Sequence, residues 1–218
     1  MKVAAKAKSF LLEAAQQQYF KEDPLLMPEE KRWLGTLEPH PHKQLSSPKK
    51  ANQEWRIREE DEKFQLWWQT QNLTTIFFDG ASKGNPGSAG AGGVIYSIDG
   101  IAKDCFSWGL GQKSNNQAEI LGLLKACNIA RDKGAKDTQV FGDSELIIKS
   151  MKMANPFRNA SLNKIQDRLK RVMLDFNTCK FYHILIKSNG EADQLANKGS
   201  SLTKGLLIVN NESNIHMP

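Results

Sequence analysis

Cysteines and long apolar runs are both scarce in this sequence. Its 218 residues include three cysteines, Cys105, Cys127 and Cys179, which lie far apart and form no CxxC pair. We therefore expect reduced thiols in an intracellular protein of the nucleus or cytoplasm, with neither disulfides nor a zinc site. No stretch approaches the roughly 18 consecutive apolar residues that a membrane-spanning helix needs. The N-terminal apolar stretch is broken and soon gives way to glutamines, which is not typical of a secretory signal.

The composition is that of an ordinary globular chain, with 39% hydrophobic and 25% charged residues, so collagen-like and wholly disordered classes are excluded. The positive charge is unevenly placed. Residues 1–70 carry 12 basic and 11 acidic side chains, whereas residues 71–218 carry 18 and 13. Nine Lys or Arg residues and only two Asp lie within 149–187. This excess favours a polyanionic partner, although charge alone is equally compatible with a solvated basic helix face.

The first 71 residues read as an N-terminal extension or linker. Residues 6–20 and 52–71 could form helices, but five prolines interrupt the chain between residues 24 and 48. We expect the tryptophans near the end of this extension (Trp55, Trp67 and Trp68) to pack on the domain that follows, because short isolated helices need tertiary contacts to persist.

From residue 72 the pattern indicates a mixed α/β domain. Apolar and β-branched runs predict strands at 73–79, 92–98, 103–110, 138–142 and 181–186. Helices are expected after Ser114, which forms a capping box with Gln117, after Asp143, over 162–176 and after Gly190. This order predicts a five-stranded mixed sheet flanked by helices: an antiparallel meander of three strands, then two strands added in parallel. We expect the domain to span 72–201 and residues 202–218 to form a C-terminal tail.

A glycine-dense segment follows the first expected strand. It contains no phosphate-loop motif and no dinucleotide fingerprint, and it leads into a strand instead of a helix. We therefore interpret it as a hairpin whose glycines allow the backbone of another element or of a ligand to approach closely.

Four acidic residues occupy the ends of strands and the starts of helices, namely Asp79, Glu119, Asp143 and Asp193. Each alone could serve a turn or a helix dipole. Four at one edge of a sheet would repel one another unless cations neutralised them, and ligation by oxygen alone favours Mg²⁺ or Mn²⁺. The pattern thus predicts a divalent-metal site.

Four segments together carry a resemblance to a known family. FFDGASKGNPGSAGAGGV, NNQAE, FGDSE and HILIKSNGEADQLAN, in this order, resemble the type 1 ribonuclease H family, specifically its plant-like and retroelement-like branch, over about 73–200. The resemblance implies an RNase H-like fold and an endonuclease that hydrolyses the RNA strand of RNA/DNA hybrids with two Mg²⁺ ions, for which Mn²⁺ could substitute. Asp79, Glu119, Asp143 and Asp193 match the family's catalytic, metal-binding carboxylates.

The same resemblance implies further site residues. It assigns contacts with the hybrid to Ser82, Asn85, Asn115, Asn116 and Glu119, although asparagines also serve turns and caps. His183 and Asn189 match auxiliary positions. Because His183 alternates with Phe181 and Leu185 in an expected strand, we favour a structural or indirect role for it. The segment between Met153 and Leu162 is too short for the extra basic helix of some family members.

Two alternatives to this function remain open. The chain could be a non-catalytic nucleic-acid-binding relic of a retroelement, although its intact set of carboxylates argues against that. It could also be a DNA-cutting metal nuclease of the same superfold, against which the GNPG and NNQAE motifs argue. The N-terminal extension resembles the end of a preceding polyprotein segment, such as a reverse transcriptase region. We expect a monomer that does not associate with membranes.

Overall fold

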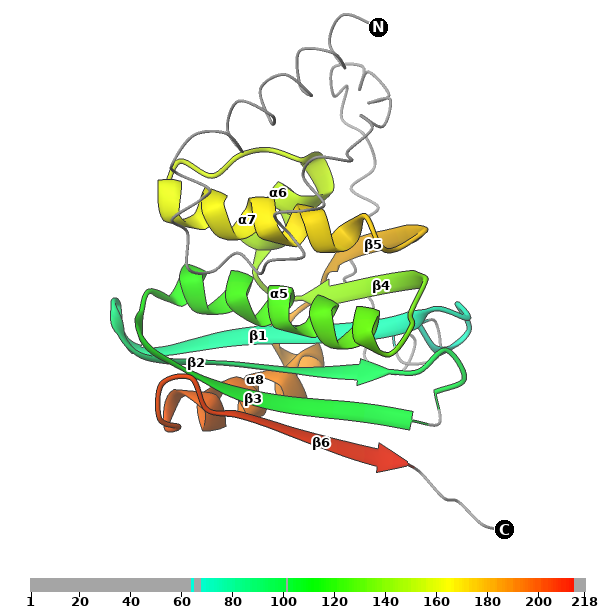
Figure 1. Cartoon of the computed structure of the whole chain (residues 1–218), viewed down its shortest axis with the longest axis horizontal. Coiled ribbons are helices and arrows are strands. Elements are labelled where there is room, and N and C mark those ends of the chain that lie inside the picture. The colour runs from blue at the N-terminus through cyan, green and yellow to red at the C-terminus, as the bar shows by residue number, and fades with distance from the viewer. Residues whose placement is uncertain (1–63, 65–67, 101, 214–218) are drawn as a thin grey trace, which may run out of the picture. The chain divides into compact units, whose positions relative to one another are not determined.

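The computed structural model describes residue 64, residues 68–100 and residues 102–213, all within one compact unit, Asn52–Pro218. The expected helix at 6–20, most of the one at 52–71, Trp55 and Trp67 lie outside the described residues. The elements are β1 (Thr74–Gly84), β2 (Gly87–Tyr96), β3 (Ala102–Lys113), α5 (Asn115–Asp132), β4 (Asp137–Gly142), α6 (Glu145–Met153), α7 (Ala160–Met173), β5 (Thr178–His183), a 3-10 turn η1 (Ile186–Ser188), α8 (Gly190–Ser200) and β6 (Leu207–Ser213) (Figure 1).

These strands form one mixed sheet in the order β5-β4-β1-β2-β3-β6. As predicted, β1, β2 and β3 form an antiparallel meander, and β4 and β5 pair in parallel. The structure adds that β4 also pairs in parallel with β1. The sheet has six strands instead of the expected five. The sixth, β6, lies in the segment expected as a tail and pairs antiparallel with β3. Its pairing covers a backbone edge of β3 that would otherwise be open.

Helices cover both faces of the sheet. On one face α5 contacts β1 and β2 and packs against α7, while α8 contacts β1, β2 and β3. In Figure 1, α5 crosses in front of the sheet and α8 lies behind it. Successive residues of β1 serve the two layers: Ile76 and Phe78 join the core under α5, and Phe77 joins the core under α8. The central strand is therefore buried on both faces, as its nearly continuous apolar sequence requires. Among the described residues, no helix is long and apolar enough to cross a membrane.

The glycine-dense segment is part of the sheet, and here the expected strand limits were wrong. β1 continues past Asp79 to Gly84 because β2 pairs with it along its whole length, so the predicted hairpin is longer and its loop shorter. The close approaches predicted for the glycines are confirmed. A Cβ on Gly90 would lie 2.0 Å from the Ser200 nitrogen, and one on Gly92 would lie 2.2 Å from the Ala196 nitrogen. Helix α8 therefore packs directly on the backbone of β2.

Two aromatic residues before β1 pack on the α8 side of the sheet. Phe64 is 1% exposed and Trp68 is 6% exposed. Their rings meet Phe77 edge-on, with centroids 6.3 Å and 5.7 Å away, and Trp68 also lies 5.0 Å from Tyr96. The packing predicted for Trp68 is confirmed, so the end of the N-terminal extension belongs physically to the sheet domain.

Candidate active site

The register of β1 and β4 brings two of the four carboxylates together. The two strands run parallel, and their last paired residues are Phe77 and Phe141. Asp79 and Asp143 each lie two residues beyond that pair, so they occupy the same end of the sheet and matching positions in the strand alternation. Asp143 follows β4 as expected. Asp79, expected at a strand end, instead lies inside β1, opposite Gly92 of β2.

Helices supply the other two carboxylates at the same end. Glu119 lies near the start of α5, whose first turn is fixed by the predicted capping box: the Ser114 N–H donates to Gln117 Oε1 at 3.0 Å, and the Gln117 N–H donates to Ser114 Oγ at 3.3 Å. Asp193 lies in the first turn of α8. The charges of Glu119, Asp143 and Asp193 all act on Asp79, so the structure unites the four predicted acids.

Burial and mutual repulsion raise the pKa values of three carboxylates, Asp79, Glu119 and Asp143. Burial, followed by the charge of Asp143, raises the pKa of Asp79 to about 8, although the Gly80 N–H donates to its Oδ1 at 2.8 Å. Burial raises the pKa of Glu119 to about 7, with Asp143 adding to the effect and the side chains of Ser144 and Asn115 opposing it. Burial also raises the pKa of Asp143. Such carboxylates release their protons when a cation offsets their charge.

The predicted asparagines form a chain of hydrogen bonds beside Glu119. Asn115 Nδ2 donates to Glu119 Oε1 at 2.8 Å, and the Asn115 backbone N–H donates to Asn85 Oδ1 at 3.1 Å. Asn85 belongs to the β1–β2 turn, so these bonds tie that turn to the start of α5. The Ser82 hydroxyl donates to the Lys113 carbonyl at 2.8 Å and holds the ends of β1 and β3 together. Nucleic-acid contact by these residues stays a prediction.

Asn116 has different surroundings. It is exposed, and together with Lys149, Phe157 and Arg158 it lines a hollow of about 610 Å³ between α5, α6 and the start of α7. Two members of the basic segment 149–187 therefore lie beside a predicted substrate contact. An exposed amide next to two cations suits a polyanion backbone.

His183 and Asn189 both hold Asp143. His183 ends β5, and its Nε2 lies 3.0 Å from the Asp143 carbonyl oxygen. Asn189 Nδ2 donates to Asp143 Oδ1 at 3.1 Å and to the Phe78 carbonyl at 3.0 Å. Asn189 thereby links the carboxylate that follows β4 to the backbone of β1. Both contacts suit an auxiliary role through Asp143.

The donor set fits a hard divalent cation. All four groups offer carboxylate oxygens, and Glu119 Oε2 is buried without a hydrogen-bond partner, which is costly unless a cation or donor approaches it. Within the described part of the chain, no three acidic, histidine or cysteine side chains are already drawn together as a ready cage for one ion. The four carboxylates lie near one another, and their side chains would have to move closer together to bind one cation.

Sequence reasoning missed the backbone contact that determines how close Glu119 lies to Asp79. A Cβ on Gly80 would lie 2.1 Å from the Glu119 nitrogen, so the residue after Asp79 has to be glycine for α5 to reach β1. The signal was present in the sequence as the glycine directly after the strand acid, within a segment where glycines were expected to permit close approach.

Comparisons with known proteins show which family and which solved structures this chain resembles. A family model described as reverse transcriptase-like matches residues 77–199. Ribonuclease HI of Halobacterium salinarum is 35% identical over 122 residues, which is 56% of this chain and 61% of that protein. The crystal structure of RNase H1 from this archaeon superposes with a TM-score of 0.54 at 34% identity, over 58% of this chain and 96% of that one.

Two further similarities extend the comparison. A bifunctional protein of Mycobacterium tuberculosis is 31% identical over 55% of this chain and 33% of its own length. The crystal structure of an RNase H1 called LC11, in complex with an RNA/DNA hybrid, has a TM-score of 0.52 and 28% identity, over 57% of this chain and 94% of that one. The chain thus spans less than two thirds of the curated relatives named here.

Proposed function

The chain belongs to the reverse transcriptase-like family of RNase H-like proteins, and from this premise we propose that it is an endonuclease that hydrolyses the RNA strand of RNA/DNA hybrids. The observation that carries the proposal is the meeting of Asp79, Glu119, Asp143 and Asp193 at one end of the sheet. The likeness to an RNase H1 crystallised with a hybrid supports the substrate class. The order and spacing of the motifs favour the plant-like, retroelement-like branch.

We propose that Asp79, Glu119, Asp143 and Asp193 hold two Mg²⁺ ions, for which Mn²⁺ can substitute. When bound, such ions activate a water molecule for attack on the phosphate and stabilise the leaving oxygen. The site's charge supports this count, since four carboxylates balance two dications. The raised pKa values of Asp79 and Glu119 support it too, because both groups need a compensating positive charge to ionise near neutral pH.

The surrounding side chains keep the carboxylates in position. Asn115 fixes one oxygen of Glu119 and leaves Oε2 available to a ligand. Asn189 and His183 hold the side chain and the carbonyl of Asp143 respectively. No side chain of the protein has to act as a nucleophile, and the catalytic work of the chain is to position negative charge.

The residues that would recognise the hybrid lie on the side of the site formed by α5. Ser82, Asn85, Asn115, Asn116 and Glu119 form a polar strip from the β1–β2 turn to the first turns of α5. Amide and carboxylate groups can sense the 2′-hydroxyls that a hybrid presents in its wide minor groove. Lys149 and Arg158, beside Asn116, would hold backbone phosphates, so binding should weaken steeply as salt rises.

The domain limits belong to the same proposal. Residues 72–201 would form the nuclease domain, residues 1–71 an extension related to a preceding reverse transcriptase region, and residues 202–218 a C-terminal segment that contributes β6. We propose that the chain acts as a monomer, because all four carboxylates come from one copy.

The test is a substrate panel with the full chain. Labelled RNA/DNA hybrid, duplex RNA and duplex DNA are incubated with Mg²⁺, with Mn²⁺ and with excess chelator. We expect cuts only in the RNA strand of the hybrid and only with metal present. Cleavage of duplex DNA would favour the DNA-cutting alternative. Binding of hybrid without any cleavage in either metal would favour the non-catalytic relic.

A further inference from the structure

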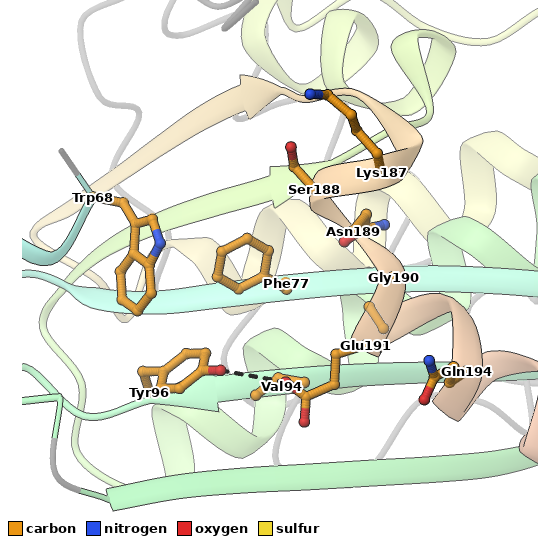
Figure 2. Close-up of a pocket in the computed structure, with 11 residues that line it drawn as sticks. Trp68, Phe77, Val94, Tyr96, Lys187, Ser188, Asn189, Gly190, Glu191 and Gln194 are labelled. Atoms are coloured by element: carbon orange, nitrogen blue, oxygen red, sulfur yellow. Dashed lines mark hydrogen bonds between the residues drawn. The ribbon is translucent and has the colours of Figure 1, made fainter. Parts of the chain in front are cut away.

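A pocket of about 440 Å³ lies beside the start of α8, on the sheet face opposite α5. Figure 2 shows its two sides: Trp68, Phe77 and Tyr96 on one, and the η1 turn with the start of α8 on the other. Val94 and Ala192 complete the apolar lining. The volume is within the range of about 300–1,000 Å³ that is usual for small-ligand sites. None of the four carboxylates lines this pocket.

One buried polar atom in the pocket wall has no partner. Asn189 is 2% exposed, and its Nδ2 already donates to Phe78 and Asp143. Its Oδ1 is buried and accepts no hydrogen bond. In Figure 2 this oxygen lies on the side of Asn189 that faces Phe77, away from the nitrogen. Buried acceptors are rarely left unpaired, so a ligand donor would satisfy this oxygen once a small movement of the pocket wall uncovers it.

Hydrogen-bond donors lie next to that acceptor. The 11-residue helix α8 begins at Gly190, and the side chain of the preceding Asn189 makes no capping hydrogen bond. The first N–H groups of a helix have no partner inside it, and Gly190, Glu191 and Ala192 all line the pocket. The wall therefore presents an acceptor and backbone donors side by side.

The pocket mouth tolerates an anion. Glu191 is the one acidic residue in the lining, and both its oxygens are engaged: Lys103 Nζ lies 2.6 Å from Oε1, and the Tyr96 hydroxyl donates to Oε2 at 3.3 Å (Figure 2). Lys187 adds a second ammonium group on the rim. Lys103 thus compensates the charge of Glu191, and a phosphate at the mouth meets no uncompensated carboxylate of the lining.

We propose that this pocket binds one nucleotide whose base is adenine or cytosine and is free of neighbouring bases. A flat base suits the aromatic wall. Its amino group would donate to Asn189 Oδ1, while the adjacent ring nitrogen would accept from the start of α8. Its phosphate would face Lys187. The nucleotide could be free in solution or be the unpaired end of a strand. This inference does not depend on the proposed hydrolysis, because binding is measured with the metals removed.

The first experiment is calorimetric titration of the full chain in excess chelator with AMP, CMP, UMP, adenosine, ribose 5-phosphate and inorganic phosphate. We expect saturable binding of AMP and CMP, weaker binding of adenosine and none of the two base-free compounds. UMP should bind at least about tenfold more weakly than CMP, because it lacks the amino donor. Binding of none of the nucleotides, or equal binding of AMP and ribose 5-phosphate, would overturn the proposal.

Substitutions in the pocket test whether AMP binds there. A Cβ on Gly190 would meet no atom within 4 Å, so Gly190→Leu can fold while filling the space beside the α8 start, and we expect it to weaken AMP binding about tenfold or more. Lys198→Leu, which adds the same side chain to an exposed position of α8, is the matched control and should leave AMP binding unchanged. A second variant, Lys187→Ala at another exposed position, should weaken AMP binding and spare adenosine. Asp79→Asn should leave AMP binding intact, which separates this pocket from the carboxylate site.

Two duplexes distinguish a free nucleotide from the unpaired end of a strand as the ligand. A hybrid with a single-nucleotide adenosine overhang is compared with a blunt one, again in chelator. If strand ends are the ligand, the overhang should tighten binding and AMP should remove that gain. If free nucleotides are the ligand, the two duplexes should bind alike while AMP still binds. AMP binding that is indifferent to both Gly190→Leu and Lys187→Ala would contradict this location.

Discussion

Gly80 and Glu119 touch through their backbones. The nitrogen of Glu119 lies 2.1 Å from the point where a side chain on Gly80 would begin, and the carbonyl carbon of Ala118 lies 2.3 Å from it. Since Gly80 directly follows Asp79, this contact sets how near the first turns of α5 approach the acid of β1. The spacing of two carboxylates is thus fixed by the absence of a side chain between them.

Because Gly80 contacts the backbone of α5, adding a single methyl group at this position should destabilise the protein. Gly80→Ala should force α5 away from β1 and lower the free energy of unfolding by roughly 1–3 kcal/mol, as overpacking does. It should also reduce hybrid cleavage per folded molecule, because Glu119 moves with the helix. Urea unfolding and single-turnover cleavage measure the two effects. Gly190→Ala is the control, since a Cβ there meets nothing within 4 Å; equal stability of the two variants would show that α5 yields easily.

Removing one carboxylate charge should abolish catalysis without unfolding the chain. Asp143→Asn preserves side-chain volume while removing a metal ligand's charge, and losing several kcal/mol of transition-state stabilisation corresponds to about a 10³-fold slower rate. Asp167→Asn makes the same change on the exposed surface of α7 and should leave the rate unchanged. The measurement is kcat on labelled hybrid, with thermal unfolding as the check on folding. Activity of Asp143→Asn close to that of the unmodified chain would rule out the proposed metal site.

Asn115 and Asn116 should differ although they are neighbours. Asn116 is exposed beside the basic hollow, so Asn116→Ala should raise KM for the hybrid with little change in kcat, by about the 1 kcal/mol of one hydrogen bond. Asn115 donates to Glu119, so Asn115→Ala should lower kcat as well. Replacing both should raise KM more than it lowers kcat. If both single variants changed only thermal stability, their role would be confined to the turn and the helix start.

The raised pKa values predict how stability depends on pH when metal is removed. Burial and Asp143 raise the pKa of Asp79 from 3.8 to about 8. Between these values the folded chain holds a proton that the unfolded chain has released, so rising pH favours unfolding. The contribution of Asp79 to stability is fully present below pH 3.8 and is lost as pH rises through about 8.

Urea unfolding in chelator from pH 5 to pH 9 should therefore show declining stability, and Asp79→Asn should flatten the decline. Mg²⁺ needs deprotonated carboxylates, so the stabilisation it gives should increase over the same interval. Parallel curves for the unmodified chain and Asp79→Asn would show that Asp79 ionises normally.

The aromatic residues before β1 predict where the domain can be cut. A chain beginning at Phe64 keeps both Phe64 and Trp68, which are almost fully buried, whereas one beginning at Asn72 loses them. Each buried side chain is worth roughly 2–3 kcal/mol, so the shorter chain should be markedly less stable. Both should cleave hybrid equally well per folded molecule at low temperature, because all four carboxylates remain. A loss of more than about tenfold in the shorter chain while it is still folded would show that these residues serve substrate binding.

Periodicity and motif order were sufficient to predict most of the fold. The capping box at Ser114 fixed the start of α5 correctly, and the parallel pairing of β4 with β5 followed from the helices between them. The four acids were chosen because each was expected next to a change of element, although Asp79 lies inside β1. These features are local in sequence, which is why residue patterns reveal them.

What the sequence left open depends on contacts between distant segments. The β1 strand extends beyond Asp79 because β2 pairs with it, and β6 exists because β3 offers it an edge. The unpartnered oxygen of Asn189 depends on how η1, α8 and β1 meet. None of these partners is adjacent in the chain, so no local pattern of apolar residues could report them.

The spread of the carboxylates along the chain has a consequence for protein synthesis. Three of them precede the end of α7, and the fourth, Asp193, arrives only with α8, the last helix. A ribosome that has translated residues 1–173 has delivered every part of the helical layer over one face, but the set of carboxylates is still incomplete. Translation products that end before residue 193, from a broken message or a premature stop, therefore lack the complete site, and the newly made chain cannot assemble it until nearly the whole domain has been synthesised.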